Sequence, residues 1–352
     1  MASGFWHRVL GRKGGQAADG ESEASTQPQP HRSDEAAAGG GLGRYQLGAE
    51  LGRGAMAVVH LAVDRESGAQ VAIKRLALQR EFAAEDLIDV RQRFMREARA
   101  AGHLKHPDIL QVLDAGEAGQ DAWIAMEYAP GRDLSHYTRA GQLLPVREVL
   151  TLVARLARAL AYAHAQGVVH RDIKPSNVMY ERASGALKIM DFGIARIADG
   201  SRTRTGLVLG TPSFMSPEQL AGLQVDGRSD LYSLGAMLYQ LLTGQLPHQS
   251  DSMAKLMYQI ANQAPPDVRH YRPGLPESLA LVLALALEKR PELRYANGEQ
   301  LAQDLEAVLA QLPAELPEDR GQDPAPPGQD FTAADPFART ERLERGEPGQ
   351  NP

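Results

Sequence analysis

The sequence predicts an α+β body in which a mostly β lobe is followed by a mostly α lobe. Apolar alternation between turn signals indicates strands over 45–51, 58–64, 70–76, 109–116 and 122–128, with a helical pattern up to about Leu104 before the fourth strand. From Leu143 onward apolar residues recur at helical spacing. This change of period predicts one lobe over residues 44–128 and a second over 129–312.

The segments at the two ends of the chain have compositions that cannot bury enough apolar surface to fold. Residues 1–43 are rich in Gly, Ser and Gln, which predicts a disordered head. Residues 313–352 contain eight of the 22 prolines and carry a net charge of −5, which predicts a disordered acidic tail. Apolar residues near the start of the head fall on one helical stripe. A disordered terminus is the favoured interpretation, and a peripheral contact through residues 5–13 is the alternative.

Composition excludes several classes of protein. The chain of 352 residues has no cysteine, which excludes disulfides, cysteine nucleophiles and thiolate metal sites and permits a reducing compartment. The body between head and tail holds 30 basic and 30 acidic residues, and this balance does not indicate nucleic-acid binding. The longest apolar run, Leu279–Leu287, is far shorter than the roughly 20 residues of a membrane span. We therefore expect a cytoplasmic protein with no nucleic-acid partner and no transmembrane segment.

A glycine-bearing turn lies between the first two predicted strands. Gly52 and Gly54 have no Cβ atom, so the backbone can approach phosphate groups closely there, although a simple hairpin explains the same residues. Lys74 ends the apolar run Val71–Lys74, where a charge needs an anionic partner. Glu97 on the following helix can supply that partner, and phosphate oxygens can take the remaining donors of the ammonium group.

Two side chains with hard oxygen atoms, Asn177 and Asp191, stand fourteen residues apart. Residues 183–185 between them are Ala-Ser-Gly, a turn signal flanked by two short apolar runs, so a hairpin would bring the two side chains together. Mg²⁺ prefers a few oxygen ligands completed by substrate phosphates. The sequence therefore predicts a magnesium site here, with Mn²⁺ as the alternative metal.

The stretch His170–Asn177 also contains two charged side chains suited to phosphoryl transfer. Asp172 is available to accept the proton of an attacking hydroxyl group. Lys174 is available to neutralise the transferring phosphoryl group. The two residues are therefore the predicted catalytic pair.

In their order, these motifs resemble the eukaryotic-like serine/threonine protein kinases, and among them the bacterial members. The resemblance covers Tyr45–Leu312 and rests on Val71–Lys74, His170–Asn177 and Asp191–Gly193. It implies a bilobal protein-kinase-like fold and Mg²⁺-dependent transfer of the γ-phosphoryl group of ATP to protein substrates. Lys174 resembles the serine/threonine branch rather than the tyrosine branch, which implies Ser or Thr acceptors.

The resemblance also implies which residues surround the nucleotide. Met126 would be the gatekeeper behind the adenine, and Glu127 and Tyr128 would begin the hinge between the lobes. The other implied nucleotide contacts are Leu51, Gly52, Arg53, Gly54, Ala55, Met56, Ala57, Val58, Val59, Ala72 and Met179. For the apolar residues of this set, ordinary core packing is an equal alternative.

Further matches to the family are implied to be structural. Glu218 would pair with Arg294, and Asp230 would anchor the backbone of the catalytic loop. Two residues depart from the family pattern: Ala57 replaces the third loop glycine, adding a methyl group near the phosphates, and Ser216 replaces an alanine. Neither change removes a charged or hydrogen-bonding group, so neither argues for an inactive enzyme.

A regulatory segment is expected over residues 201–206, which are polar and lack apolar periodicity. By the resemblance, Arg171 and Arg196 would face this segment, and two guanidinium groups close together favour a phosphate. We therefore expect autophosphorylation of Thr203, Thr205 or both, in trans within a homodimer. Solvated loop threonines are the alternative.

Two other functions compete with an active kinase. A pseudokinase-type scaffold would be favoured by loss of Lys74, Asp172 or Asp191, and all three are present. A nucleotide-binding regulator of the same fold is weakened by Gly210–Ser213 and the neighbouring Ser-Pro-Glu, which resemble a platform for protein substrates.

Overall fold

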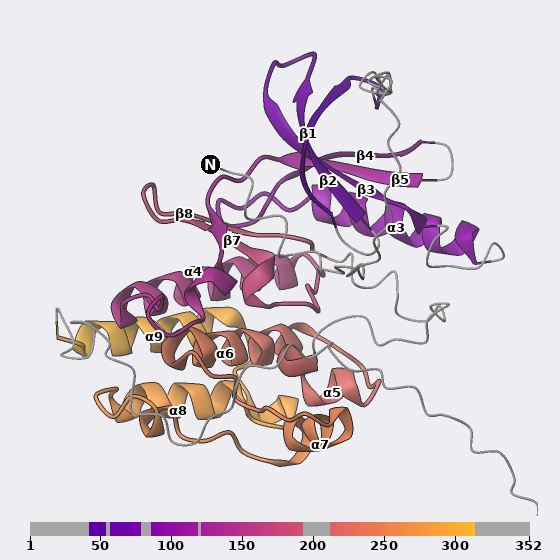
Figure 1. Ribbon diagram of the computed structural model, residues 1–352. Helices are drawn as coiled ribbons and strands as arrows, with labels where there is room; N and C mark the ends of the chain where they lie inside the picture. The colour runs from indigo at the N-terminus through magenta and orange to yellow at the C-terminus, as the bar shows by residue number, and fades with distance from the viewer. Residues whose placement is uncertain (1–41, 54–56, 79–85, 119–120, 193–211, 314–352) are drawn as a thin grey trace, which may run out of the picture.

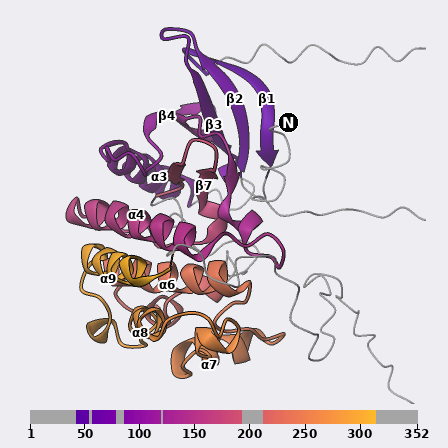
Figure 2. The ribbon, with the colours of Figure 1, turned by 90° about the vertical axis from the view of Figure 1, so that its left-hand side faces the viewer.

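The computed structural model describes residues 42–53, 57–78, 86–118, 121–192 and 212–313. They form a small lobe dominated by a β-sheet and a larger lobe of packed helices (Figure 1), and a view turned by 90° shows the same two lobes (Figure 2). The predicted α+β bilobal fold is therefore confirmed.

The small lobe is a five-stranded antiparallel sheet in the order β1-β2-β3-β5-β4. Its strands are β1 (Tyr45–Arg53), β2 (Ala57–Asp64), β3 (Gln70–Leu76), β4 (Val112–Ala118) and β5 (Asp121–Glu127). The helix α3 (Leu87–Gly102) packs against β4 and β5. Its buried face consists of Val90, Phe94, Ala98 and Ala101, spaced so that they share one side of the helix.

The fourth strand begins later than its apolar pattern predicts, at Val112 rather than Ile109. Residues 106–109 form a turn, in which the Ile109 N–H donates to the His106 carbonyl at 3.1 Å. The next backbone bonds cross to the large lobe, where Leu110 N–H donates to Ile189 O and Ile189 N–H donates to Asp108 O, both at 2.8 Å. These apolar residues are therefore buried against another strand rather than within the sheet.

The large lobe begins with a small three-stranded sheet in the order β6-β7-β8. Its strands are β6 (Arg132–Asp133), β7 (Val178–Glu181) and β8 (Ala186–Ile189). The hairpin predicted around residues 183–185 forms as β7 and β8, with Gly185 at φ 71° in the left-handed region that glycine adopts without strain.

Six α-helices of the large lobe belong to the described residues. They are α4 (Val146–Ala165), α5 (Pro217–Leu220), α6 (Gly227–Thr243), α7 (Met253–Asn262), α8 (Glu277–Ala286) and α9 (Gly298–Gln311). Short 3₁₀ helices lie at Leu134–Tyr137, Pro175–Asn177, Pro212–Phe214, Val268–His270 and Pro291–Leu293. Within the described ranges, no helix is long and apolar enough to cross a membrane.

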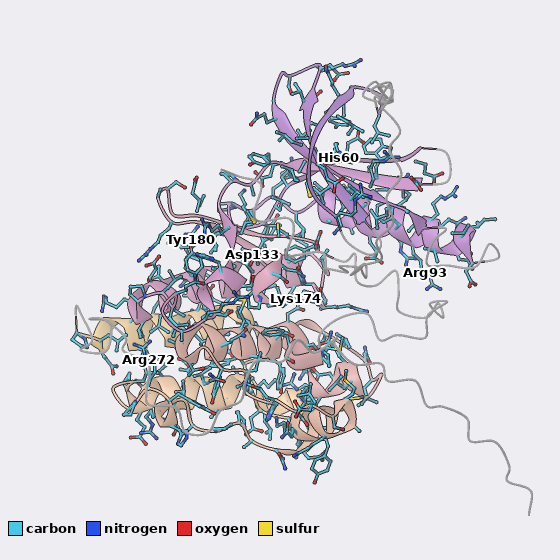
Figure 3. The ribbon with its side chains drawn as sticks, viewed as in Figure 1. His60, Arg93, Asp133, Lys174, Tyr180 and Arg272 are labelled. Carbon is cyan, nitrogen blue, oxygen red and sulfur yellow. The ribbon has the colours of Figure 1, made fainter. Side chains whose placement is uncertain are left out.

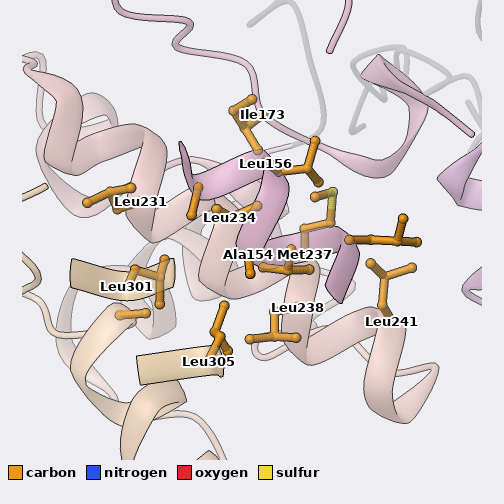
Figure 4. Packing of buried hydrophobic residues seen from close by; sticks show 14 of the residues in the cluster. Ala154, Leu156, Ile173, Leu231, Leu234, Met237, Leu238, Leu241, Leu301 and Leu305 are labelled. Carbon is orange, nitrogen blue, oxygen red and sulfur yellow. The ribbon is translucent and has the colours of Figure 1, made fainter. Parts of the chain in front are cut away.

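The core of the large lobe forms where α4, α6 and α9 meet. Figure 4 shows Leu156 of α4, Leu238 of α6 and Leu305 of α9 in one cluster, and each is at most 1% exposed. The helix α6 begins at an Asp226 cap, whose carboxylate accepts the Arg228 N–H, and ends at Gly244 with φ 73°. Because α6 is buried along most of its length, its polar residues lie inside the lobe.

Close packing between α9 and α4 predicts a large effect of one methyl group. A Cβ atom added to Gly298 would lie 2.0 Å from the Ala157 carbonyl oxygen of α4. We expect Gly298→Ala to lower the free energy of unfolding by about 3 kcal/mol, the range of core overpacking, as measured by urea denaturation. In the matched control Gly102→Ala, the nearest atom is 3.8 Å away, and we expect a change within about 0.5 kcal/mol. Equal losses in the two variants would contradict this packing.

Candidate active site

An apolar cluster lies where the two lobes meet. Leu51, Val59, Ala72, Met126 and Met179 come from five different strands and are all buried in one cluster, with Tyr128 packed against it. The sequence predicted these six as nucleotide contacts, with Tyr128 at the start of the hinge and core packing as the alternative for the apolar residues, and the structure brings them together. It adds Leu110, Ala129 and Met190, which the sequence analysis missed. Of these, Met190 could have been predicted from the sequence, because it directly precedes Asp191.

The Glu127 carboxylate is bound by residues outside this cluster. Its Oε1 accepts the Gln111 N–H at 2.8 Å and the Lys188 ammonium at 2.6 Å. Its own N–H donates to Gln111 O at 3.0 Å. The start of the hinge is therefore tied to β8, and neither Gln111 nor Lys188 carried a sequence signal for this role.

The described ends of the glycine loop differ in exposure. Gly52 is buried at the end of β1, whereas the Arg53 side chain is 57% exposed and pairs with Glu50 at 2.6 Å. The Ala57 methyl group is buried in a cluster that includes Phe94 of α3, and Val58 beside it is half-buried. The methyl expected near the phosphates therefore packs in the core of the small lobe. Residues 54–56 lie outside the described residues.

Lys74 pairs with a different carboxylate from the one predicted. Its Nζ lies 2.8 Å from Asp191 Oδ1, whereas Glu97 contacts Arg96 at 3.5 Å. Among the described residues, the expected Lys74–Glu97 ion pair is not formed. The physical reason is that the Asp191 carboxylate, which is 24% exposed, needs a counter-charge, and the Lys74 ammonium provides it.

The charge of Asp191 is stabilised by its neighbours. Burial alone would raise the pKa of Asp191, but the charge of Lys74 and its hydrogen bond, with smaller contributions from His170 and Lys174, hold that pKa below 3.8. The backbone of Asp191 has φ 62°, an uncommon conformation for a residue with a Cβ. The side chain is therefore a fixed anion at neutral pH.

The predicted catalytic pair lies beside Asn177. Lys174 Nζ is 2.7 Å from Asp172 Oδ2, and Asn177 Nδ2 donates to Asp172 O at 2.7 Å and to Oδ2 at 2.9 Å. Figure 3 shows Lys174 in the region between the two lobes. The Met190 N–H donates to Asn177 O at 2.8 Å, which holds Asn177 next to the residue before Asp191.

The donor set of Asn177 and Asp191 fits a metal that is completed by substrate oxygens. The amide nitrogen of Asn177 is bound to Asp172, which leaves its carbonyl oxygen Oδ1 to face a metal. Across the described parts of the chain, no group of three acidic or histidine side chains forms a metal cage. One carboxylate and one amide oxygen agree with the preference of Mg²⁺ for a few protein ligands plus phosphates.

Asp230 of α6 holds the backbone that carries this site. Its fully buried carboxylate accepts the His170 and Arg171 N–H groups at 2.8 and 2.7 Å and contacts His164 Nε2 at 2.7 Å. Arg171 has φ 70°, so the loop contains a second non-glycine residue in the left-handed region. His164, which the sequence analysis missed, belongs to this anchor.

A second buried anchor joins α5 to the end of the large lobe. Arg294 donates to both oxygens of Glu218 at 2.7 Å, and Ser229 Oγ donates to Glu218 at 2.5 Å. Next to Glu218, Gln219 Nε2 donates to Arg171 O at 2.8 Å, so α5 also holds the catalytic loop. Ser216 forms a capping box at the start of α5 together with Gln219.

The predicted regulatory residues are only partly covered by the structure. Arg171 lies in the described catalytic loop beside Asp172. Arg196, Thr203 and Thr205 lie outside the described residues.

Comparison with known proteins places the chain in a family. The family described as "Protein kinase domain" matches residues 45–306, so the chain belongs to the protein kinase family. This family uses ATP and a divalent metal.

Two curated relatives and one solved structure make the relationship more specific. The chain is 41% identical over 296 residues to the serine/threonine-protein kinase PknB of Mycobacterium leprae, an alignment that covers 82% of this chain and 45% of that protein. It is 42% identical over 286 residues to PknB of Mycobacterium tuberculosis, covering 78% of this chain and 44% of that one. The crystal structure of the PknI kinase domain of Mycobacterium tuberculosis matches with a TM-score of 0.63 and 33% identity, over 77% of this chain and 99% of that domain. The chain thus spans less than half the length of these curated relatives.

The buried Glu218–Arg294 pair predicts a large loss of stability when one charge is removed. The two side chains are 6% and 0% exposed, so Glu218→Gln leaves a buried guanidinium group without a counter-charge. We expect a loss of about 3 kcal/mol in the free energy of unfolding at pH 7, measured by urea denaturation. The matched control Glu306→Gln breaks the exposed Arg158–Glu306 pair and is expected to cost less than about 1 kcal/mol.

The same pair predicts a pH dependence. Burial would raise the pKa of Glu218, but hydrogen bonds from Arg294 and Ser229 outweigh it and hold the pKa below 4.5. The contribution of this group is therefore fully present above pH 4.5 and is lost as the pH falls through the lowered pKa. Wild type should lose this part of its stability in acid, and Glu218→Gln should not. If the free energy of unfolding changed with pH in the same way in both proteins, Glu218 would not be the group responsible.

Proposed function

We propose that this chain is an active protein kinase that transfers the γ-phosphoryl group of ATP to Ser or Thr hydroxyl groups of proteins. The observation that carries the proposal is the convergence of Lys74, Asp172, Asn177 and Asp191 beside one apolar cluster between the lobes. The names of the curated relatives, all serine/threonine-protein kinases, support the residue preference.

Each charged side chain has a distinct part in this proposal. Asp172 accepts the proton of the acceptor hydroxyl, and Asn177 holds its carboxylate in place through the 2.9 Å hydrogen bond. Lys174, in contact with Asp172, neutralises negative charge on the transferring group. Asn177 and Asp191 hold Mg²⁺, or Mn²⁺ in its place, which when bound offsets the charge of the phosphates.

The nucleotide is held by residues of both lobes in this proposal. The adenine lies against the apolar cluster, with Met126 behind it, and the glycine loop from Leu51 to Val59 covers the phosphates. Lys74 takes a phosphate oxygen when nucleotide is bound, because its ammonium group has three donors and Asp191 occupies one. In this nucleotide-bound state, Glu97 is a second carboxylate that pairs with Lys74.

The domain boundaries and the partners are part of the same proposal. Residues 44–312 form the catalytic body, and residues 1–43 and 313–352 flank it in the sequence. Protein substrates are the partners, and a second copy of the chain phosphorylates Thr203 or Thr205, which Arg171 and Arg196 then bind. The lack of cysteine agrees with a cytoplasmic setting for this reaction.

A pseudokinase-type scaffold is the alternative function. It would bind nucleotide and partners without turnover. The intact set Lys74, Asp172 and Asp191 favours the active enzyme over the scaffold.

Two single substitutions test the assigned roles. Asp172→Asn should lower kcat toward a Ser/Thr peptide by about 100-fold, with the Kd for ATP nearly unchanged, because this residue acts on the acceptor hydroxyl. Asp191→Asn should abolish transfer and weaken binding of Mg-ATP, because the lost charge serves the metal. Steady-state kinetics and calorimetric titration measure both quantities, with Glu306→Gln as a surface control. Wild-type turnover in either variant would refute the site.

The regulatory threonines have a separate test. The double variant Thr203→Ala/Thr205→Ala should have at least about tenfold lower activity toward a peptide, because the phosphates that order the substrate platform cannot be added. Phosphosite mapping of wild type after incubation with Mg-ATP should find phosphate on one or both threonines. Equal activities, with no phosphate on either residue, would exclude this switch.

A further inference from the structure

Three side chains that the kinase reaction does not use meet within the large lobe. Lys289 follows α8, His248 lies between α6 and α7, and Tyr232 belongs to α6. Lys289 Nζ is 3.1 Å from His248 Nε2 and 5.7 Å from the centre of the Tyr232 ring. Tyr232 is 1% and His248 6% exposed, whereas Lys289 as a whole residue is half-buried.

The protonation states in this cluster are unusual. Burial, and after it the charge of Lys289, lower the pKa of His248 to about 4, so its ring is neutral at pH 7 and Nε2 presents a lone pair to Lys289 Nζ. Burial and then the charge of Arg294 lower the pKa of Lys289 to about 8, against a smaller opposite effect of Glu288. The uncharged amine of Lys289 is therefore more populated at pH 7 than that of an ordinary lysine.

Among the described residues, no carboxylate forms an ion pair with Lys289 Nζ. The nearby Glu218 is bound to Arg294, whose guanidinium carbon also lies 4.9 Å from the centre of the Tyr232 ring. Two cations thus share one aromatic ring, and only Arg294 is paired with an acid. A basic side chain with an imidazole at hydrogen-bond distance has the arrangement of a nucleophile and its proton acceptor.

We propose that Lys289 is an acylation site, at which Nζ attacks the carbonyl carbon of an activated acyl donor and His248 Nε2 accepts the proton. The donor is an acyl phosphate or an acyl thioester. An N–C bond forms, the C–O or C–S bond of the donor breaks, and the phosphate or thiolate leaves with the electron pair. The proton passes from His248 to solvent, and the product is a neutral amide. No oxidant or reductant takes part.

The proposal predicts selective modification of the intact chain. The purified full-length protein, without nucleotide, is incubated with acetyl phosphate or, separately, with acetyl-coenzyme A, and initial acetylation rates at each lysine are measured by peptide mass spectrometry. Lys255, exposed on α7, is the internal control. At pH 7 we expect Lys289 to react at least about tenfold faster than Lys255 with one or both donors, and its rate to level off above about pH 8.

The two donors identify the source of the acyl group. A selective reaction with acetyl phosphate alone assigns the acyl phosphate, and one with acetyl-coenzyme A alone assigns the thioester. A rate at Lys289 equal to or below that of Lys255 with both donors overturns the proposal.

Two variants test the parts of the site. Lys289→Arg keeps a cation over Tyr232 and should remove the selective acetylation. His248→Leu should lower the Lys289 rate by about tenfold, because the proton acceptor is lost. An unchanged rate in a His248→Leu protein with a cooperative thermal unfolding transition overturns the role of His248. If that variant does not fold, the pH profile of the wild type decides: a rate at Lys289 still rising steeply at pH 10 overturns the proposal.

Discussion

The catalytic loop depends on one buried carboxylate. Asp230 accepts two consecutive backbone N–H groups, from His170 and Arg171, and contacts the His164 ring. A fully buried charge is costly unless it is fully hydrogen-bonded, and these three partners meet that requirement. Because α6 lies in the core of the large lobe, the loop that presents Asp172 is attached to a buried helix.

This anchor also explains how the loop keeps an uncommon backbone conformation. Arg171 has φ 70°, which costs about 1 kcal/mol or more for a residue with a Cβ. The bond from its N–H to Asp230 and the bond from Gln219 to its carbonyl hold it from both sides. The strain is therefore maintained by two elements, α5 and α6, that are themselves joined through the Glu218 interactions with Ser229 and Arg294.

A second system of contacts joins the small lobe to the same loop. Asp108, in the turn before β4, pairs with Arg155 of α4 and accepts the Ile189 N–H of β8. At the hinge, Lys188 of β8 binds Glu127. Since β8 leads directly into Asp191, the lobes are joined on two sides of the residue that pairs with Lys74. The position of the proposed metal ligand thus depends on both lobes.

Local patterns in the sequence determined the order of the lobes, most strands, and the hairpin that brings Asn177 near Asp191. Periodicity and turn residues act over a few residues, and a sequence displays them directly.

The start of β4 was predicted wrongly, because the same apolar residues can be buried in a sheet or against β8. The bonds of Lys188 to Glu127 and of Gln219 to Arg171 carried no local signal. The tertiary structure also decided that Lys74 pairs with Asp191 and that Lys289 lies against His248. These contacts join residues far apart in the chain, and desolvation and packing select them only after the core has formed.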